Sequence, residues 1–346
     1  MSAPNAPLAQ HVNFGLIYDF RNPPQWRTPW SDFYAGILEQ VAWIDADLAI
    51  DGVYLSEHHF VADGCMPSVM ATLGAFAAAT RRIALGANII QFPLHHPLRI
   101  AEDALALDVL TRGRYRLGLA NGYRQIEFDA FGVSMRERRS RVEEGIEILR
   151  LAFAGEPFSF AGRHWTFPEI TMTPPPIRPG GPEIWLGGLI PAAIERAGRI
   201  ADGFLGMATD HLTDYFEVCE RNGLPAARRQ ACMTYWAIVT DDPEKAIAEV
   251  GPHFMYQVND YIDYGFLGDI PHYTDAQSVV DDGVYLVLDE DEAVATFRAA
   301  VDAGAQEIQF LPLMPGEPID RAAERLQFLS ERVIPRVRAA SAPPSA

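Results

Sequence analysis

Side chains that can transfer protons stand together directly after a short apolar run. The run Val53-Tyr54-Leu55 leads through Ser56 into Glu57, His58, His59 and Phe60. An apolar run that ends in polar side chains is typical of a buried parallel strand, and α/β proteins bind ligands at the carboxyl ends of such strands. Since an imidazole titrates near neutral pH, this strand end is a candidate site for proton transfer.

The two histidines are not equivalent. Neighbouring side chains of an extended chain point to opposite faces, so at most one of His58 and His59 faces a given ligand. The residues alone also allow both rings to be structural, with Glu57 orienting one of them. The rest of the chain has to decide between these interpretations.

Several other chemistries lack their sequence signals. The chain contains neither GxGxxG after a strand, nor a P-loop, nor GxSxG, which disfavours a Rossmann nicotinamide site, phosphoryl transfer and a serine esterase. Histidines with zinc-motif spacing are missing. Cys65, Cys219 and Cys232 are far apart and form no CxxC, so we expect reduced thiols and no metal site.

Charge and hydropathy disfavour further classes of function. The net charge of -18 disfavours binding to nucleic acid or to anionic membranes, which need clustered lysine and arginine. No apolar run approaches the roughly 20 residues of a membrane span, and the N-terminus does not resemble a signal peptide. We therefore expect a soluble cytoplasmic protein.

Strand and helix patterns alternate along the chain. Apolar runs predict eight strands, at about 12–18, 53–55, 82–90, 113–120, 183–186, 203–207, 232–240 and 307–311. Periodic segments predict the helices between them, at 31–50, 70–80, 98–110, 135–153, 191–200, 212–222, 243–257, 290–303 and 318–338. Strands that are apolar on both faces and alternate with helices favour a closed (β/α)8 barrel.

Two segments interrupt the alternation. Residues 155–182 hold a hairpin pattern at 158–167 and a proline-rich stretch, and we interpret them as an insertion. Residues 259–285 show no clear period and are too long for a plain connection, which suggests a functional cover. We expect one domain over 1–346, with flexible tails at 1–10 and 339–346.

An ordered series of motifs resembles the bacterial luciferase-like flavin-dependent monooxygenase family. The series covers about residues 12–210. Its members are Glu57-His58-His59-Phe60, Gly86-Ala87-Asn88-Ile89-Ile90, His96-Pro97-Leu98-Arg99-Ile100-Ala101-Glu102-Asp103, Leu107-Asp108-Val109-Leu110-Thr111-Arg112-Gly113-Arg114, Gly118-Leu119-Ala120-Asn121-Gly122, Glu127-Phe128, Phe131-Gly132, Trp185-Leu186-Gly187-Gly188 and Ala201-Asp202-Gly203.

The resemblance implies an enzyme that uses reduced FMN and O2, through a C4a-(hydro)peroxyflavin, to oxidise an apolar organic substrate. It implies that His58 is the catalytic histidine, with Glu57 as its partner or as a flavin contact. It also implies a cis peptide bond between Asn88 and Ile89 beneath the flavin ring. Ala120 stands where luciferase has a cysteine, and Asn121 where many members have a phosphate-binding arginine, so Asn121 is expected on the flavin ring or ribityl chain instead.

The remaining site predictions concern the two ends of the flavin. The turn Gly187-Gly188-Leu189-Ile190 precedes a helix and offers N–H groups to a phosphate, although these glycines could merely end a strand. Arg124 is the nearby basic candidate. Around the ring and its substrate side we expect aromatic or imidazole groups, namely Tyr123, Trp26, Trp30, Phe92 and His96.

Alternatives of other classes stay open. A deazaflavin-dependent oxidoreductase would share the same barrel, and a non-catalytic flavin-binding subunit would share the family. The resemblance also implies a homodimer formed through helices near 69–79 and 99–110. Because the chain has no nicotinamide motif, we expect a separate NAD(P)H flavin reductase to supply reduced FMN.

Overall fold

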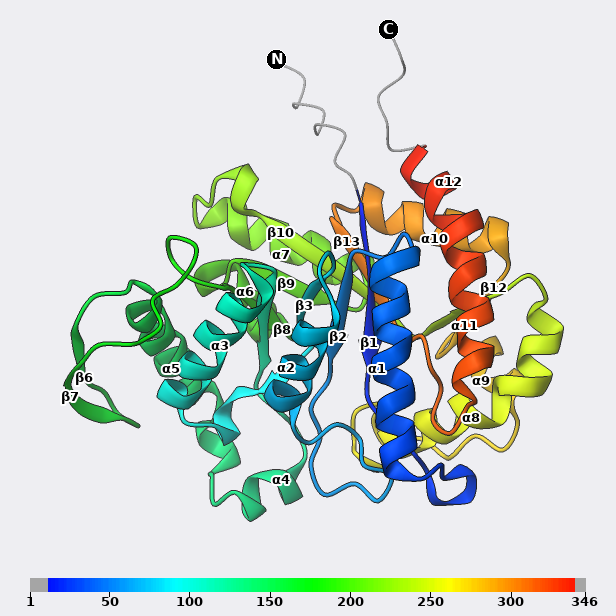
Figure 1. The fold of residues 1–346 in the computed structure, drawn as a ribbon, viewed down its shortest axis with the longest axis horizontal. Helices are drawn as coiled ribbons and strands as arrows, with labels where there is room; N and C mark the ends of the chain where they lie inside the picture. Colours follow the sequence, from blue (N-terminus) through cyan, green and yellow to red (C-terminus); the bar gives the residue numbers. More distant parts are fainter. Residues whose placement is uncertain (1–11, 340–346) are drawn as a thin grey trace, which may run out of the picture.

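A closed barrel of parallel strands forms the centre of the molecule (Figure 1). The computed structural model describes residues 12–339, and the predicted tails lie outside this range except for Ala339, which ends a helix. Eight strands within this range form the barrel: β1 (Asn13–Tyr18), β2 (Gly52–Leu55), β3 (Ala84–Ala87), β5 (Tyr115–Ala120), β8 (Glu183–Gly187), β9 (Gly203–Gly206), β10 (Gln230–Tyr235) and β13 (Glu307–Phe310). The predicted (β/α)8 barrel is therefore confirmed.

Strand pairing closes the barrel on both sides of β1 and between β3 and β5. β1 pairs in parallel with β2 and with β13, and β3 pairs with β5. A Cβ atom at Gly118 of β5 would lie 1.9 Å from the carbonyl oxygen of Ala87, so only glycine permits this approach of the two strands. A short strand, β4 (Ile90–Gln91), follows β3 and also pairs with β5.

Amphipathic helices surround the barrel (Figure 1). Ile37, Val41 and Ile44 of the first helix are fully buried, which confirms the stripe that predicts it. The longer helices and the C-terminal helix are α1 (Trp30–Asp47), α2 (Val69–Ala79), α3 (Pro97–Thr111), α5 (Arg138–Phe153), α6 (Pro191–Ile200), α7 (Thr209–Arg221), α8 (Pro243–Asp263), α10 (Glu290–Asp302), α11 (Ile319–Phe328) and α12 (Ile334–Ala339). A π-helix at Leu329–Val333 joins α11 to α12.

Three predictions about the later part of the chain are wrong in detail. The expected strand 232–240 is two strands, because β11 (Ala237–Val239) leaves the barrel and pairs with β12 (Leu286–Leu288). The expected helix 243–257 continues to Asp263, because the buried stripe of Val250, Phe254 and Val258 extends to Ile262. A further helix, α9 (Ala276–Asp281), lies in the segment predicted to be irregular.

Two smaller elements complete the fold. The predicted hairpin is present as β6 (Phe158–Ala161) and β7 (Thr166–Ile170), and it lies at the edge of the molecule beside α5 (Figure 1). A six-residue helix, α4 (Gln125–Ala130), follows β5 and was not predicted. Among residues 12–339, no helix combines the length and the apolar composition that a membrane crossing requires.

Candidate active site

A cavity of about 370 Å³ opens at the carboxyl ends of the barrel strands. This volume falls within the range of small-molecule sites, and the location is where barrel enzymes bind their substrates. Residues predicted from the sequence line much of the wall: Glu57, His58, Asn88, Ile89, Ala120, Asn121, Tyr123, Gly187, Gly188, Leu189 and Ile190. Residues with no predicted role complete it, notably Ser56, Gln91, Arg138, Trp236, Tyr261 and Phe266.

His58 is fixed on both of its ring nitrogens. Its Nδ1 lies 3.1 Å from Oε1 of Glu127, and its Nε2 lies 3.4 Å from the hydroxyl oxygen of Tyr123. Burial lowers the pKa of His58 below its ordinary value, although Glu127 acts in the opposite direction. A neutral ring that donates from Nδ1 to the Glu127 carboxylate carries no proton on Nε2, so Nε2 can accept one.

Glu127 on α4 positions both histidines. Its Oε1 accepts hydrogen bonds from the backbone N–H of His59, at 2.9 Å, and from Nη1 of Arg124, at 2.9 Å. Burial would raise the pKa of Glu127, but the hydrogen bond with His58 lowers it below its ordinary value overall. The motif that includes Glu127 belongs to the family resemblance, but the sequence alone assigned this carboxylate no role.

Arg124 is used differently from the prediction. Its guanidinium pairs with Glu127, donates to the carbonyl oxygen of His59 at 2.8 Å and covers the ring of Tyr264 at 4.1 Å. Its side chain is nearly buried and is not part of the cavity wall. The basic residue in that wall is Arg138, at the start of α5, which forms no ion pair with any residue between 12 and 339.

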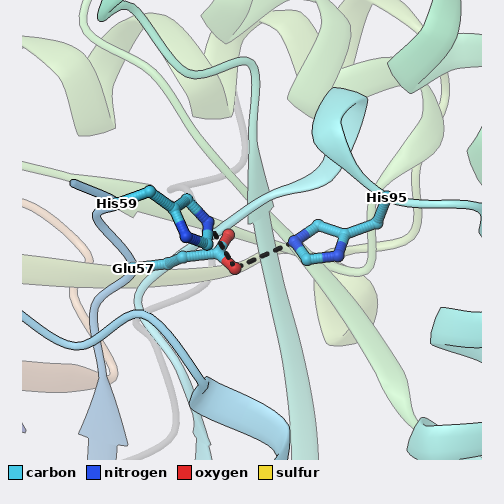
Figure 2. Close-up of side chains that lie close together, drawn as sticks. All are labelled: Glu57, His59 and His95. Atoms are coloured by element: carbon cyan, nitrogen blue, oxygen red, sulfur yellow. Dashed lines mark hydrogen bonds and ion pairs between the residues drawn. The ribbon is translucent and has the colours of Figure 1, made fainter. Parts of the chain in front are cut away.

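The Glu57 carboxylate lies between the rings of two other histidines, His59 and His95, as Figure 2 shows. Its Oε1 is 2.8 Å from Nε2 of His95 and 3.3 Å from Nε2 of His59, while its Oε2 accepts from the backbone N–H of Gln91 at 2.5 Å. Burial raises the pKa of Glu57, but the interactions of its carboxylate with the rings of His59 and His95 prevail and lower it to about 2. We call Glu57, His59 and His95 the Glu57 cluster.

The predicted phosphate turn lies at the start of α6. Gly187 to Ile190 lead into Pro191, and Leu189 and Ile190 are exposed. A Cβ atom at Gly188 would lie 2.3 Å from Cβ of Ala193, so this glycine is needed for the close approach of the turn to the helix. Asn121 lies near it in the cavity wall, where its Oδ1 accepts from Nη1 of Arg196 at 3.4 Å.

Ser56, Asn88 and Gln91 bring polar groups to one part of the cavity wall. The peptide bond between Asn88 and Ile89 is cis, as the resemblance implies. The Asn88 amide donates across the barrel to Thr234 and Gln309, at 3.0 and 2.9 Å. The hydroxyl of Ser56 and Oε1 of Gln91 are buried in the wall without a hydrogen-bond partner among the described residues, so they can bond to a bound ring.

Four residues predicted for the substrate side lie elsewhere. Trp26 packs on His253, with ring centroids 4.2 Å apart, and Trp30 is 39% exposed beside Arg27. Phe92 is buried against Gly145 of α5, and His96 caps the N-terminus of α3.

Other aromatic side chains line the cavity in their place. Trp236, Tyr261 and Phe266 pack on one another, and Phe266 also contacts Tyr123. Tyr261 and Phe266 belong to the segment that was predicted to be a cover, but no residue in that segment was singled out.

Comparison with known proteins agrees with the fold. A model of the family described as luciferase-like monooxygenase matches residues 13–307. The chain therefore belongs to the luciferase-like monooxygenase family.

Its relatives include both oxygenases and dehydrogenases. The chain is 28% identical to an F420-dependent glucose-6-phosphate dehydrogenase of Nakamurella multipartita, over 85% of this chain and 92% of the relative. It is 26% identical to the oxygenase component of a flavin-dependent trigonelline monooxygenase of Acinetobacter baylyi, over 42% of this chain and 41% of the relative. This chain also matches only 42% of the length of an uncharacterised Sinorhizobium fredii protein called y4vJ.

A solved structure matches the whole barrel. The monooxygenase RslO1 of Streptomyces bottropensis is 25% identical, with a TM-score of 0.80, and the match covers 94% of this chain and 99% of that one. Membership of this family supports a general assignment of the chain as a flavin-dependent monooxygenase or oxidoreductase.

Proposed function

We propose that this protein is a monooxygenase that uses reduced FMN and O2 to oxidise an apolar organic substrate such as an aldehyde, a ketone or a natural-product intermediate. The observation that carries the proposal is the position of His58, a buried imidazole in the cavity wall whose Nδ1 is held by Glu127. Bound reduced FMN would supply the electrons that activate O2.

The chain offers separate contacts for the two ends of the cofactor. The isoalloxazine would rest on Asn88 and Ile89 and bond to the Ser56 hydroxyl. The phosphate would meet the backbone N–H groups of the 187–190 turn at the start of α6 and the guanidinium of Arg138. This contact gives an acidic protein a local site for an anion.

His58 would accept or return the proton that the oxidation moves, at Nε2. Its Nδ1 hydrogen bond to Glu127 fixes the ring orientation, and Tyr123 limits its rotation. Trp236, Tyr261 and Phe266 would exclude water and contact an apolar substrate.

The proposed partners follow from the same reasoning. A separate NAD(P)H flavin reductase would supply reduced FMN, in keeping with a relative whose name describes an oxygenase component.

A homodimer is proposed through α2 and α3, where Val109 and Leu110 are 42% and 59% exposed. Light scattering of the purified chain would measure its mass in solution.

A second candidate function is hydride transfer with coenzyme F420. The observation that favours it is the 28% identity to an F420-dependent dehydrogenase over most of both chains. Titrating the purified protein with FMN and with F420, and following the fluorescence of each, measures which one binds more tightly. Tight F420 binding with weak FMN binding would replace our proposal with this one.

The oxygenase proposal is tested by mixing the protein, loaded with reduced FMN, with O2 and recording the return of oxidised FMN absorbance. We expect this return to be slower than for free reduced FMN and faster when an aldehyde or ketone substrate is added. With His58→Gln, FMN binding should persist while substrate oxidation is lost. Unchanged substrate oxidation in this variant would contradict the role of His58.

The phosphate contact has its own test. Arg138→Gln should weaken FMN binding by about 10 to 100-fold, because a charge-assisted hydrogen bond contributes about 1.5–3 kcal/mol. Its affinity for riboflavin, which lacks the phosphate, should not change. Arg139→Gln is the matched control, since Arg139 is the exposed neighbour on the same helix and is not part of the cavity wall.

A further inference from the structure

The Glu57 cluster gathers three metal-ligating side chains from separate segments. Glu57 and His59 follow β2, while His95 follows β4 and a 3-10 turn, and 38 residues separate His95 from Glu57. One possible ligand atom from each of the three side chains lies within 4.8 Å of the other two. Figure 2 shows both imidazoles turned toward the carboxylate between them.

Hydrogen bonding alone leaves one of these atoms unused. His95 is hydrogen-bonded to Glu57 at 2.8 Å, but Nε2 of His59 is buried and has no hydrogen-bond partner among the described residues. It lies 3.3 Å from Glu57 Oε1 outside hydrogen-bond geometry, and His59 is only 7% exposed. A buried imidazole nitrogen that has no hydrogen-bond partner among residues 12–339, but lies 3.3 Å from a carboxylate oxygen, points to a ligand that the three side chains share.

Contacts from outside the cluster hold the ligand atoms in place. The backbone N–H of Gln91 binds Oε2 of Glu57, which leaves Oε1 for the shared position. Glu127 binds the backbone N–H of His59 and so fixes the residue that carries the unpartnered ring. Outer contacts of this kind orient the ligands of known metal sites.

We propose that Glu57, His59 and His95 bind a divalent transition-metal ion, with Zn²⁺ as the best fit. Two imidazoles and one carboxylate match the ligands of zinc sites, whereas Mg²⁺ and Ca²⁺ prefer oxygen ligands only. Ligands about 2.1 Å from a tetrahedral ion lie about 3.4 Å apart. The 3.3 Å between Oε1 of Glu57 and Nε2 of His59 fits this value. The 2.8 Å between Oε1 of Glu57 and Nε2 of His95 would lengthen by about half an ångström on ion binding.

The site would have an open position and a route from solvent. The side chain of His95 is 29% exposed, whereas those of Glu57 and His59 are 3% and 8% exposed, so an ion would enter past His95 and keep water there as a fourth ligand. The ion would tie the end of β2 to the segment after β4. Because Glu57 also lines the main cavity, the ion would stiffen one wall of that cavity.

The test uses the full chain without a histidine tag, stripped of metal with a chelator. Titration with Zn²⁺ against a chromogenic zinc indicator should give one ion per chain. His59→Gln and His95→Gln should each weaken binding by at least about tenfold, the loss that follows even from removing an outer contact of a metal site. Zn²⁺ should raise the Tm of the native protein and leave that of His95→Gln unchanged.

A matched control separates this site from adventitious surface binding. His272 forms an exposed pair with Asp263 at 2.8 Å, so His272→Gln removes a surface histidine near a carboxylate. This variant should bind Zn²⁺ like the native protein. Circular dichroism of each metal-free variant establishes that it is folded, and Co²⁺ in place of Zn²⁺ should give the visible absorption of an ion bound by nitrogen and oxygen.

The proposal does not depend on flavin binding or on turnover. It is overturned if the native protein binds no stoichiometric Zn²⁺, or if folded His59→Gln and His95→Gln bind as tightly as the native protein. It is equally overturned if His272→Gln abolishes binding while the two cluster variants do not. Equal loss in both cluster variants, with His272→Gln unaffected, supports a shared ion.

Discussion

Replacing Glu127 with glutamine tests the central contact of the site. The amide keeps the size of the side chain but removes its charge. In the native protein Oε1 of Glu127 accepts from His58, His59 and Arg124 at 3.1, 2.9 and 2.9 Å, in a side chain that is fully buried. The substitution therefore weakens three hydrogen bonds and leaves Arg124 without its counter-ion.

The cost can be worked out from these contacts. A hydrogen bond to a charged group contributes about 1.5–3 kcal/mol and a neutral one about 1 kcal/mol, so each of the three bonds loses about 1 kcal/mol. Arg124 keeps its bond to the carbonyl oxygen of His59 and its contact with the Tyr264 ring, which limits the further penalty. We expect Glu127→Gln to lower the free energy of unfolding by about 3 kcal/mol.

The same substitution should affect the proposed reaction separately from stability. The amide oxygen can still accept from Nδ1 of His58, but a neutral amide no longer stabilises the charged imidazolium that forms when Nε2 accepts a proton. We expect turnover with reduced FMN to fall by at least about 100-fold, the lower end of what proton transfer contributes. FMN binding should be little changed, because Glu127 is not part of the cavity wall.

Urea unfolding, FMN titration and turnover measure the three effects. Asp129→Asn is the control, because Asp129 lies on the same helix and forms an exposed bond with Gln125. A free energy of unfolding for Glu127→Gln within about 0.5 kcal/mol of the native value would match an ordinary surface change and refute the electrostatic argument. Normal turnover at normal FMN binding would refute the argument about His58.

Other predictions address the barrel and its buried charges. Gly118→Ala should prevent folding or lower Tm sharply, since the new Cβ would lie 1.9 Å from the carbonyl oxygen of Ala87, and a native-like thermal transition would contradict this reading of the closure. Gly74→Ala, in α2 with nothing within 4 Å of the new atom, should instead raise stability by about 1 kcal/mol in urea unfolding. Burial raises the pKa of Asp19 to about 6 from an ordinary 3.8, so the folded state binds more protons than the unfolded state between these values. The free energy of unfolding should therefore fall by about 3 kcal/mol between about pH 4 and 6 through this group. Over this pH range, the free energy of unfolding should fall less steeply for Asp19→Asn than for the native protein, and equal slopes would contradict the prediction.

Local pattern was enough to predict most elements. The helix at 31–50 and the strand end at 53–60 depend on residues close in sequence, whose period and polarity are visible without a structure. The extension of α8 to Asp263 was also visible in principle, because its buried positions recur every fourth residue through Ile262. The missed strand at 286–288 is only three residues long, and it is stabilised by β11 rather than by its own pattern.

The sequence by itself determined that a carboxylate and two imidazoles end one barrel strand, and that His58 and His59 face different surroundings, because side chains of an extended chain alternate. Only the tertiary structure decided which partner each one has. Glu127 reaches His58 across 69 residues, and His95 reaches Glu57 across 38. Such long-range contacts depend on the register of neighbouring strands and on the path of their loops. Register and loop path result from packing over the whole barrel, not from the preferences of any single segment.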